Sequence, residues 1–259
     1  MKVITYSICF LSMILFSHCA TGQFHKNPVI AHRGAWKTDK IPQNSIAALN
    51  RAGELKCFGS EFDVHLTKDD ILVVTHDHDF YGIDIESSTY QELLKKKHPN
   101  GESIPTAKEY LLAGKNHRKT KLIFELKASK VSKSRTLKAA EIAVNLVKEL
   151  GLQKQVEYIS FDYDALKKIV ELDPKAKVAY LTGHVSPADA RNDGLSGLDY
   201  HISFYKKYTN LIDESRDVGL TTNVWTVNLK EDMIWFLDKK IDYITTDEPE
   251  LLFQVIKSK

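Results

Sequence analysis

The sequence predicts an α/β fold, a (β/α)8 barrel of the TIM type with an extra hairpin strand after strand 2. Short runs rich in β-branched and aromatic residues alternate with helical patterns from residue 28 to the C-terminus, which is typical of a parallel sheet. Nine such runs are present, and one of them is the extra second strand of a hairpin. The remaining eight match the strand number of this barrel. No repeat or Pro/Gly/Ser-rich linker interrupts the pattern, so we predict one domain.

The elements follow one another in order. The predicted strands are residues 28–34, 60–66, 71–77, 121–127, 155–161, 177–183, 198–204, 222–227 and 241–247. The predicted helices between them are residues 44–53, 132–150, 162–172, 206–218 and 230–238. The helix at 132–150 is the clearest, because its apolar residues recur at helical spacing and Gly151 follows as a stop signal.

One connection breaks the alternation. Leu66 and Ile71 are separated only by Thr-Lys-Asp-Asp, which is far too short for the crossover helix of a parallel pair. We therefore predict a β-hairpin that turns at Asp69-Asp70.

A two-residue turn fixes the register of this hairpin. It pairs Lys68 with Ile71 and places Asp63 opposite His76. Because side chains alternate along a strand, Glu61 would then lie on the same face as Asp63 and His76. The sequence predicts that two carboxylates and a histidine share one surface.

The composition excludes some classes of partner. The chain has 259 residues with Lys+Arg 36 against Asp+Glu 34, a net charge of +2. This balance gives no electrostatic reason to expect a nucleic acid or another acidic polymer. Cys57 is the one cysteine outside the N-terminal leader, so we expect no disulfide within the domain and a small buried apolar role for Cys57.

Residues 1–22 read as a signal peptide. One lysine precedes an apolar run from Val3 to Phe16, which is shorter than the ~20 residues of a membrane span. Ala-Thr-Gly before Gln23 fits cleavage by the ordinary signal peptidase. Phe-Ser-His-Cys is alternatively a loose lipobox, with cleavage before Cys19 and a lipid on that residue. Both alternatives predict an exported protein: periplasmic, membrane-anchored as a lipoprotein, or secreted.

Polar side chains lie at the ends of several predicted strands. In such barrels the C-terminal ends of the strands converge on one mouth, where active sites lie. We expect this mouth to gather His32, Arg33, Glu61, Asp63, His76, Glu125 and Lys127.

The residue types in this set indicate a chemistry. Three carboxylates repel one another unless a cation joins them, and oxygen ligands suit Mg²⁺, Ca²⁺ or Mn²⁺. Two histidines are suited to donate and accept protons near neutral pH. An arginine and a lysine beside a divalent cation suit a phosphoryl group. The set predicts metal-assisted cleavage of a phosphate ester.

A series of motifs resembles the glycerophosphodiester phosphodiesterase family. They are AHRGAWKTDKIPQNSIAALNRA, GSEFDVHLTKDDILVVTHD, IPTAKEYL, IFELK, ISFD, VWTVN and ITTDEP, in this order. The resemblance covers essentially the whole chain after the leader, and we assign residues 27–259 to one domain of this type.

The resemblance implies both an activity and a set of roles. The family folds as a (β/α)8 barrel with a hairpin after its second strand. It hydrolyses glycerophosphodiesters, such as glycerophosphocholine or glycerophosphoethanolamine, to glycerol 3-phosphate and an alcohol. A glycerol hydroxyl attacks first, and water opens the resulting cyclic phosphate. The implied roles are acid/base catalysis for His32 and His76, binding of one Ca²⁺ or Mg²⁺ for Glu61, Asp63 and Glu125, and phosphate binding for Arg33 and Lys127.

The chain departs from the family pattern in two places. The family usually has Pro-Glu-Asn-Thr after the first strand, where this chain has Pro-Gln-Asn-Ser with the neutral Gln43. We expect Asn44 and Ser45 to begin the following helix. The Arg-Thr-Thr often found after the second histidine is missing, and we expect residues 78–105 to form a small insertion over the mouth that affects head-group preference.

Other polar residues near these motifs receive different interpretations. We take His65 and His78 as non-catalytic. Trp225 either contacts the substrate or fills the barrel. Asp247 precedes Pro249 as a helix N-cap would.

Two rival functions remain open. One is a related lipid phosphodiesterase of the phospholipase C or D type. The other is a catalytically inactive barrel that binds phosphodiesters. The sequence indicates no protein partner.

Overall fold

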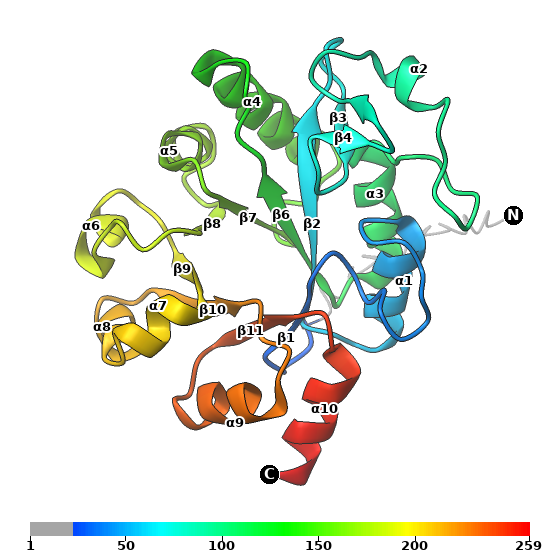
Figure 1. Cartoon of the computed structure of the whole chain (residues 1–259). Helices are drawn as coiled ribbons and strands as arrows, with labels where there is room; N and C mark the ends of the chain where they lie inside the picture. The colour runs from blue at the N-terminus through cyan, green and yellow to red at the C-terminus, as the bar shows by residue number, and fades with distance from the viewer. Residues whose placement is uncertain (1–22) are drawn as a thin grey trace, which may run out of the picture.

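The computed structural model describes residues 23–259, so the predicted signal peptide and Cys19 lie outside the described residues. A closed barrel of parallel strands occupies the centre, and helices surround it (Figure 1). The barrel strands are β1 (Val29–Ala31), β2 (Gly59–Leu66), β6 (Lys121–Leu126), β7 (Val156–Ser160), β8 (Lys177–Tyr180), β9 (Gly197–His201), β10 (Thr221–Trp225) and β11 (Tyr243–Thr246). Pairing of β1 with both β2 and β11 closes the ring. The predicted fold class is confirmed.

The helices connect successive strands around the outside. They are α1 (Ile46–Glu54), α3 (Ala107–Gly114), α4 (Lys133–Glu149), α5 (Tyr163–Leu172), α6 (Pro187–Asn192), α7 (Ile202–Lys207), α8 (Leu211–Asp217), α9 (Lys230–Asp238) and α10 (Pro249–Ser258). A 3₁₀ turn, η1 (Lys115–His117), follows α3. Among the described residues no helix is long and apolar enough to cross a membrane.

Four of the five predicted helices, 44–53, 132–150, 162–172 and 230–238, agree with the observed bounds to within two residues. In α4, the side chain of Ser132 accepts a hydrogen bond from Arg135 N, and Gly151 ends the helix region with a φ of +66°. The single helix predicted at 206–218 is wrong. Two short helices, α7 and α8, occupy this region instead, because the backbone leaves the helical conformation at Tyr208.

The extra strand, β3 (Leu72–Val74), continues the sheet beyond the barrel. The first part of β2 pairs with β1, at Ala31 and Ser60. The last part pairs antiparallel with β3, at Leu66 and Leu72. The hairpin therefore extends past the C-terminal end of β1 and lies beside the mouth of the barrel.

The predicted register of this hairpin is wrong by one residue. Val64 pairs with Val74, so Asp63 faces Thr75 and not His76. The loop is longer by one residue than predicted because Asp70 adopts a left-handed conformation, with a φ of +64°, as in three-residue hairpin loops. The Thr67 hydroxyl stabilises this loop by accepting a hydrogen bond from Ile71 N at 3.0 Å.

The apolar core has two layers. Outward-facing strand residues pack beneath the helices, and Phe62, for example, stacks on Tyr110 and contacts Phe124. Ile30 and Ile123 belong to a smaller cluster in the barrel interior. Truncating a fully buried phenylalanine such as Phe62 to alanine typically costs about 3–5 kcal/mol.

The insertion after β3 is small and packs against the hairpin. It contains β4 (Asp79–Phe80), β5 (Ile83–Asp84) and the single-turn helix α2 (Tyr90–Leu93). Because of the observed register, Val73 points away from the main core and packs with Phe80 and Ile104.

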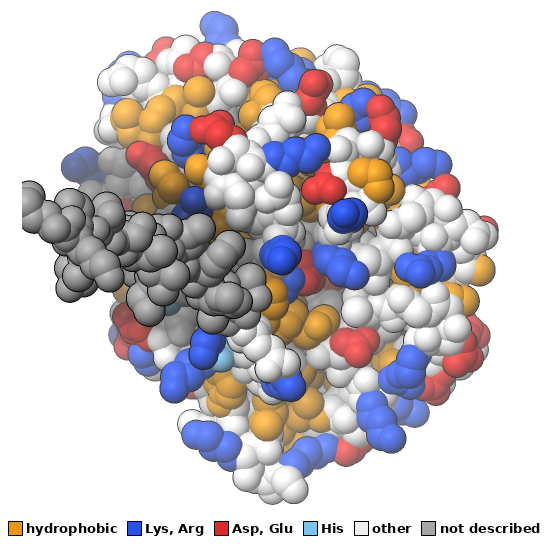
Figure 2. Space-filling model, turned by 180° about the vertical axis from the view of Figure 1, so that it is seen from behind, with side chains coloured by type: hydrophobic (Ala, Val, Ile, Leu, Met, Phe, Trp, Pro, Cys, Tyr) orange, Lys and Arg blue, Asp and Glu red, His pale blue; other side chains and the backbone are white. Residues whose placement is uncertain are grey.

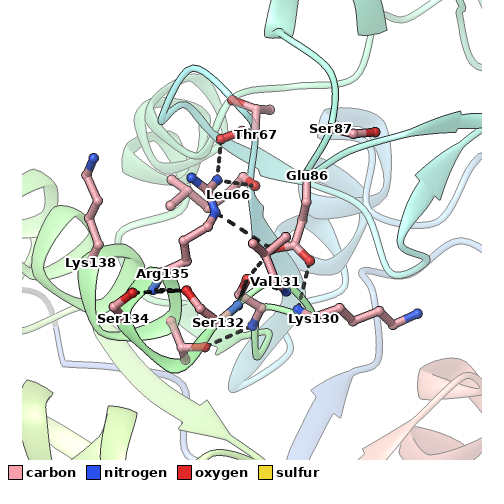
Figure 3. A network of polar contacts seen from close by, with 12 residues as sticks. Leu66, Thr67, Glu86, Ser87, Lys130, Val131, Ser132, Ser134, Arg135 and Lys138 are labelled. Carbon is pink, nitrogen blue, oxygen red and sulfur yellow. Dashed lines mark hydrogen bonds and ion pairs between the residues drawn. The ribbon is translucent and has the colours of Figure 1, made fainter.

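A polar network fastens the insertion to the barrel (Figure 3). Glu86 accepts hydrogen bonds from Lys130 N, at 2.8 Å, and from the Ser129 hydroxyl. Arg135 of α4 donates to the backbone oxygen of Thr67, at 2.7 Å. The loop that follows Lys127 is thereby held between the insertion and α4.

Candidate active site

The polar strand ends converge on one cavity at the barrel mouth. It has a volume of about 120 Å³. Its polar walls include His32, Arg33, Glu61, His76, Glu125 and Lys127. Asp63 lies beside them but is buried, with 1% of its surface exposed. The structure thus brings together all seven side chains that the sequence placed at the mouth.

Three carboxylates form the floor of this site. Glu61 and Asp63 both come from β2, and Asp63 pairs in register with Glu125 of β6. One oxygen from each lies within 4.8 Å of the others, and all three residues are buried.

Burial and mutual repulsion raise the pKa of two of these carboxyl groups. Burial, and then the charges of Asp63 and Glu125, raise the pKa of Glu61 well above its ordinary value. Burial and Asp63 raise the pKa of Glu125 to about 8. Within residues 23–259, Glu61 Oε1 is buried without a hydrogen-bond partner. Closely spaced carboxylate oxygens with an unpartnered acceptor fit a hard divalent cation, so the residues present are suited to hold one.

Asp63 is fixed from two sides. Its Oδ2 accepts a hydrogen bond from Asn44 Nδ2 at 2.8 Å, and its backbone N donates to Asn44 Oδ1 at 3.1 Å. Lys127 Nζ lies 2.8 Å from Asp63 Oδ1 and 2.7 Å from Glu125 Oε1. Burial opposes ionisation of Asp63, but Lys127, and then His76 and Arg33, hold its pKa below the ordinary value.

The role expected for Asn44 was wrong. It does not begin α1, because Ser45 is the N-cap and accepts a hydrogen bond from Ala48 N. Asn44 instead has a φ of +58°, which turns its amide toward Asp63. Sequence reasoning missed this contact because asparagine is favoured both at helix caps and in left-handed turns.

Arg33 lies in a strained turn directly after β1. Its φ is +56°, and its backbone N donates to Glu61 Oε2 at 2.8 Å. The guanidinium donates to Gln43 Oε1 at 2.7 Å and lies 3.6 Å from Asp63 Oδ2. Gly34 follows with a φ of +80°, where a Cβ would approach Ala48 to 2.6 Å. Only glycine fits this close contact with α1.

His32 is paired with Asp247, and this contact corrects a sequence prediction. His32 Nδ1 lies 2.7 Å from Asp247 Oδ1. Asn228 holds the other carboxylate oxygen through its Nδ2, at 2.7 Å. Asp247 does not cap α10, since Glu248 occupies the cap position. Its position at the end of the last barrel strand was the signal that sequence reasoning underweighted.

Electrostatics agree with an ionised Asp247. Burial favours its protonated form, but the hydrogen bond with His32 holds its pKa below the ordinary value. A carboxylate on Nδ1 directs the other ring nitrogen of His32, Nε2, toward the site.

His76 reaches the cavity despite the shifted register, because β3 ends at Val74 and the chain turns inward. Its Nδ1 lies 2.8 Å from Asp77 Oδ1. Burial lowers the pKa of His76, and the charge of Asp63 opposes this effect.

His65 supports His76 from behind. Its Nε2 forms a hydrogen bond of 3.0 Å with the backbone oxygen of His76. Burial lowers the pKa of His65 to about 4, so the ring is neutral at pH 7 and Nε2 carries the donated proton. His65 is absent from the cavity wall.

A second hollow adjoins the first. This outer groove of about 590 Å³ lies between residues 40–44 and the insertion. Its walls include Asp77, Asp79 and the exposed ring of Tyr81. His76 lines both hollows. The insertion therefore borders the mouth on one side, beside the outer groove.

The chain was compared with known proteins. The model of the glycerophosphoryl diester phosphodiesterase family matches residues 32–251. The chain belongs to this family. A glycerophosphodiester phosphodiesterase from Caldanaerobacter subterraneus is 30% identical, over 90% of this chain and 98% of that protein.

Solved structures of family members agree. The crystal structure of a glycerophosphodiester phosphodiesterase from Parabacteroides distasonis is 43% identical, with a TM-score of 0.87 over 91% of this chain and 98% of that one. A phosphodiesterase from Oleispira antarctica, solved in complex with the product sn-glycerol-3-phosphate, shares the fold at 24% identity, with a TM-score of 0.77 over 89% and 97% of the two chains. The expectation of a phosphodiester-hydrolysing enzyme is confirmed at the level of the family.

Trp225 occupies one apolar side of the phosphodiesterase cavity. Its ring lies edge-on to Phe161, at 5.5 Å between centroids, and both rings line the cavity. Its Nε1 donates to the backbone oxygen of Asp199, at 2.9 Å. Trp225 thus fills part of the barrel and also presents a face to the cavity.

Asp199 is a polar residue of this cavity that the sequence did not single out. It is 2% exposed, and burial raises its pKa to about 7. Its place in the middle of a short β-run, without a recognisable motif, gave no signal.

Proposed function

We propose that this protein hydrolyses glycerophosphodiesters, such as glycerophosphocholine or glycerophosphoethanolamine, to glycerol 3-phosphate and the free alcohol. The arrangement that carries the proposal is a buried acidic triad next to Arg33 and Lys127, with His32 and His76 on the same cavity wall. The Oleispira antarctica phosphodiesterase was solved with sn-glycerol-3-phosphate, the product that this reaction would release, which supports the proposal.

Charge balance supports an anionic diester. The three carboxylates of the triad face two cations, Arg33 and Lys127. A divalent ion held by the triad, which we propose to be Ca²⁺ or Mg²⁺, would leave one positive charge for the single negative charge of a phosphodiester. When bound, such an ion supplies positive charge that stabilises the developing negative charge of the reaction.

Each of the two hollows can bind one arm of the diester. The inner cavity contains the carboxylates and the Trp225 face, and we assign the glycerol arm to it. The alcohol arm then extends past His76 into the outer groove. Asp77 and Asp79 on the groove wall favour a positively charged alcohol such as choline or ethanolamine.

The histidines differ in what surrounds them. His32, oriented by Asp247, takes the proton from the glycerol hydroxyl that attacks phosphorus. His76, at the junction of the two hollows, donates a proton to the oxygen of the departing alcohol. A cyclic phosphate results, and water then opens it with the two histidines exchanging roles. Arg33 and Lys127 hold the phosphate oxygens throughout.

The activity is tested by the release of glycerol 3-phosphate. The protein is stripped with a chelator and assayed with both substrates after Ca²⁺ or Mg²⁺ is restored. We expect the metal to restore turnover, His76→Ala to abolish it, and the matched control His78→Ala to retain it. Metal binding without turnover would identify a phosphodiester-binding barrel. Accumulation of a cyclic phosphate would identify a lipid phosphodiesterase of the cyclising type.

We also propose that the protein is exported, on the basis of residues 1–22. Fractionation of cells that express the full chain tests this, with incorporation of labelled fatty acid as the readout for lipid on Cys19. Cys19→Ala should remove the label if Cys19 is the modified residue. A cytosolic full-length chain would contradict export.

A further inference from the structure

Exposed basic side chains gather at the end of the barrel opposite the mouth. They belong to the segment before β1 and to the segments that lead from α1, α3, α4 and α9 into the next strand, where the N-terminal ends of the strands lie. We define the basic rim as Lys26, Lys56, Arg118, Lys119, Lys154 and Lys240, all of which are exposed. Lys and Arg side chains are spread widely over the rear face of the molecule (Figure 2).

The side chains of the basic rim are free of ion pairs among the described residues. None of its six residues forms an ion pair within residues 23–259, whereas Lys37, Lys133 and Lys206 near the mouth each pair with a carboxylate. Among the acidic residues at the same end, Asp173 and Asp217 form no ion pair within residues 23–259, and two others have partners outside the rim. Asp242 accepts two hydrogen bonds from Thr222, and Asp193 pairs with Lys167.

The local effect of this charge is visible at His25. Burial, and then the charges of Lys119 and Lys56, lower the pKa of this histidine. The basic side chains therefore act together on a group that lies between them.

The chain enters the barrel at this same end. Phe24 packs against the interior apolar cluster beneath Lys121, whose Nζ lies 4.1 Å from the ring centre. His25 N donates to Lys119 O at 2.9 Å, and Asn27 Nδ2 donates to Lys56 O at 2.9 Å.

The leader is therefore joined directly to the basic rim. Cys19 precedes Phe24 by five positions in the sequence. A fully extended chain of that length spans about 17 Å. A lipid on Cys19 would hold the basic rim, and not the mouth, close to a bilayer.

We propose that the basic rim is a docking surface for an anionic lipid bilayer, and that the catalytic mouth faces away from it. Anionic lipid surfaces attract clustered lysine and arginine side chains in this way. The inference rests on the proposed export of the protein and extends the proposed function. In this orientation the mouth receives diesters from solution, and phospholipids within the same bilayer do not reach it.

Lysine footprinting of the full chain tests this orientation. The protein is bound to vesicles of phosphatidylcholine with or without phosphatidylglycerol and treated with an acetylating reagent that does not cross membranes. Modification of Lys119, Lys154 and Lys240 is compared by mass spectrometry with that of Lys130 and Lys230, which are exposed near the mouth. We expect the three rim lysines to be protected at least threefold on anionic vesicles, with loss of protection at high salt. Equal protection at both ends, or protection of the mouth lysines, would overturn the proposal.

A charge-reversal variant tests whether the basic rim binds the bilayer independently of the catalytic site. Lys119→Glu/Lys154→Glu/Lys240→Glu should abolish the protection of Lys26 and Lys56 on anionic vesicles, whereas the control Lys130→Glu should not. Glycerophosphocholine turnover should be unchanged in both variants. Persistent protection in the triple variant would refute the docking surface. Protection by RNA without protection by vesicles would also refute it and would identify a nucleic-acid surface. Absence of turnover in the wild type would contradict the proposed function while leaving the footprint readable.

Discussion

Replacing Glu125 with glutamine should stabilise the metal-free protein. Burial and Asp63 raise the pKa of Glu125 from 4.5 to about 8. At pH 7 the unfolded chain has released this proton, whereas the folded chain largely retains it. Because pH 7 lies well above the ordinary pKa of 4.5, keeping this proton in the folded state lowers the free energy of unfolding by about 3 kcal/mol at pH 7. Because the folded pKa is the higher one, the cost is absent below pH 4.5 and grows as the pH rises toward 8.

Glutamine removes this cost and keeps an oxygen for Lys127. We therefore expect Glu125→Gln to raise the Tm of the chelator-treated protein at pH 7 by roughly 6–12 °C, at about 2–4 °C per kcal/mol for a chain of this size. The gain should shrink as the pH is lowered to 5. Added Ca²⁺ or Mg²⁺ should stabilise the wild type, by about 2.7 kcal/mol at a concentration of one hundred times Kd, but not the variant.

Thermal unfolding followed by circular dichroism between pH 5 and pH 8 is the assay. Glu141→Gln, a substitution of an exposed glutamate on α4, serves as the matched control and should change the Tm little. If the metal-free Glu125→Gln variant is no more stable than the wild type at pH 7, or if its gain does not depend on pH, the electrostatic reasoning for the triad is refuted.

Three further substitutions test the surroundings of the triad. Asp247→Asn should lower kcat by roughly 10²–10⁴ with little change in KM, because an amide no longer fixes the tautomer of His32; an unchanged kcat would contradict the pairing. Gln43→Glu should raise KM severalfold at constant kcat, because a carboxylate would compete with the phosphate for Arg33. Steady-state kinetics measures both constants, and an unchanged KM would contradict this competition. Burial lowers the pKa of His65 to about 4, so between pH 6.5 and 4 the unfolded chain protonates this ring while the folded protein keeps it neutral. The free energy of unfolding should therefore fall by about 3 kcal/mol as the pH drops from 6.5 to 4. Urea unfolding of His65→Gln should show a smaller loss over this range, and an identical loss would contradict the assignment.

The barrel and the gathering of the site residues were predictable from the sequence for one reason. Both follow from patterns that are local in the chain, namely the alternation of apolar runs with helical segments and the polar residues at strand ends. The (β/α)8 architecture then determines where these ends meet. His32, Arg33, Glu125 and Lys127 could be placed at one mouth without knowledge of any individual contact.

The errors have a common physical origin. Asn44 and Asp247 have side chains that commonly cap helices, and both precede one. Their actual partners lie 19 and 215 residues away in the sequence. The hairpin register depended on the conformation of a single residue, Asp70, which also allows a shorter turn. Each of these side chains can serve either a neighbouring helix or turn or a partner far away in the sequence. The packing of the folded chain decides between the two, and a local sequence pattern carries no information about that packing.

The position of His76 between two hollows has a kinetic consequence. In the proposed binding mode, an alcohol in the outer groove would be free to diffuse away once its bond to phosphorus is broken, whereas the phosphate would remain among Arg33, Lys127 and the triad. The two products should therefore leave in a fixed order, with the alcohol first and glycerol 3-phosphate last. In the steady state, glycerol 3-phosphate would compete with the substrate, whereas the alcohol would not. Intracavity retention of the phosphate would then make the enzyme sensitive to the level of its own phosphorylated product.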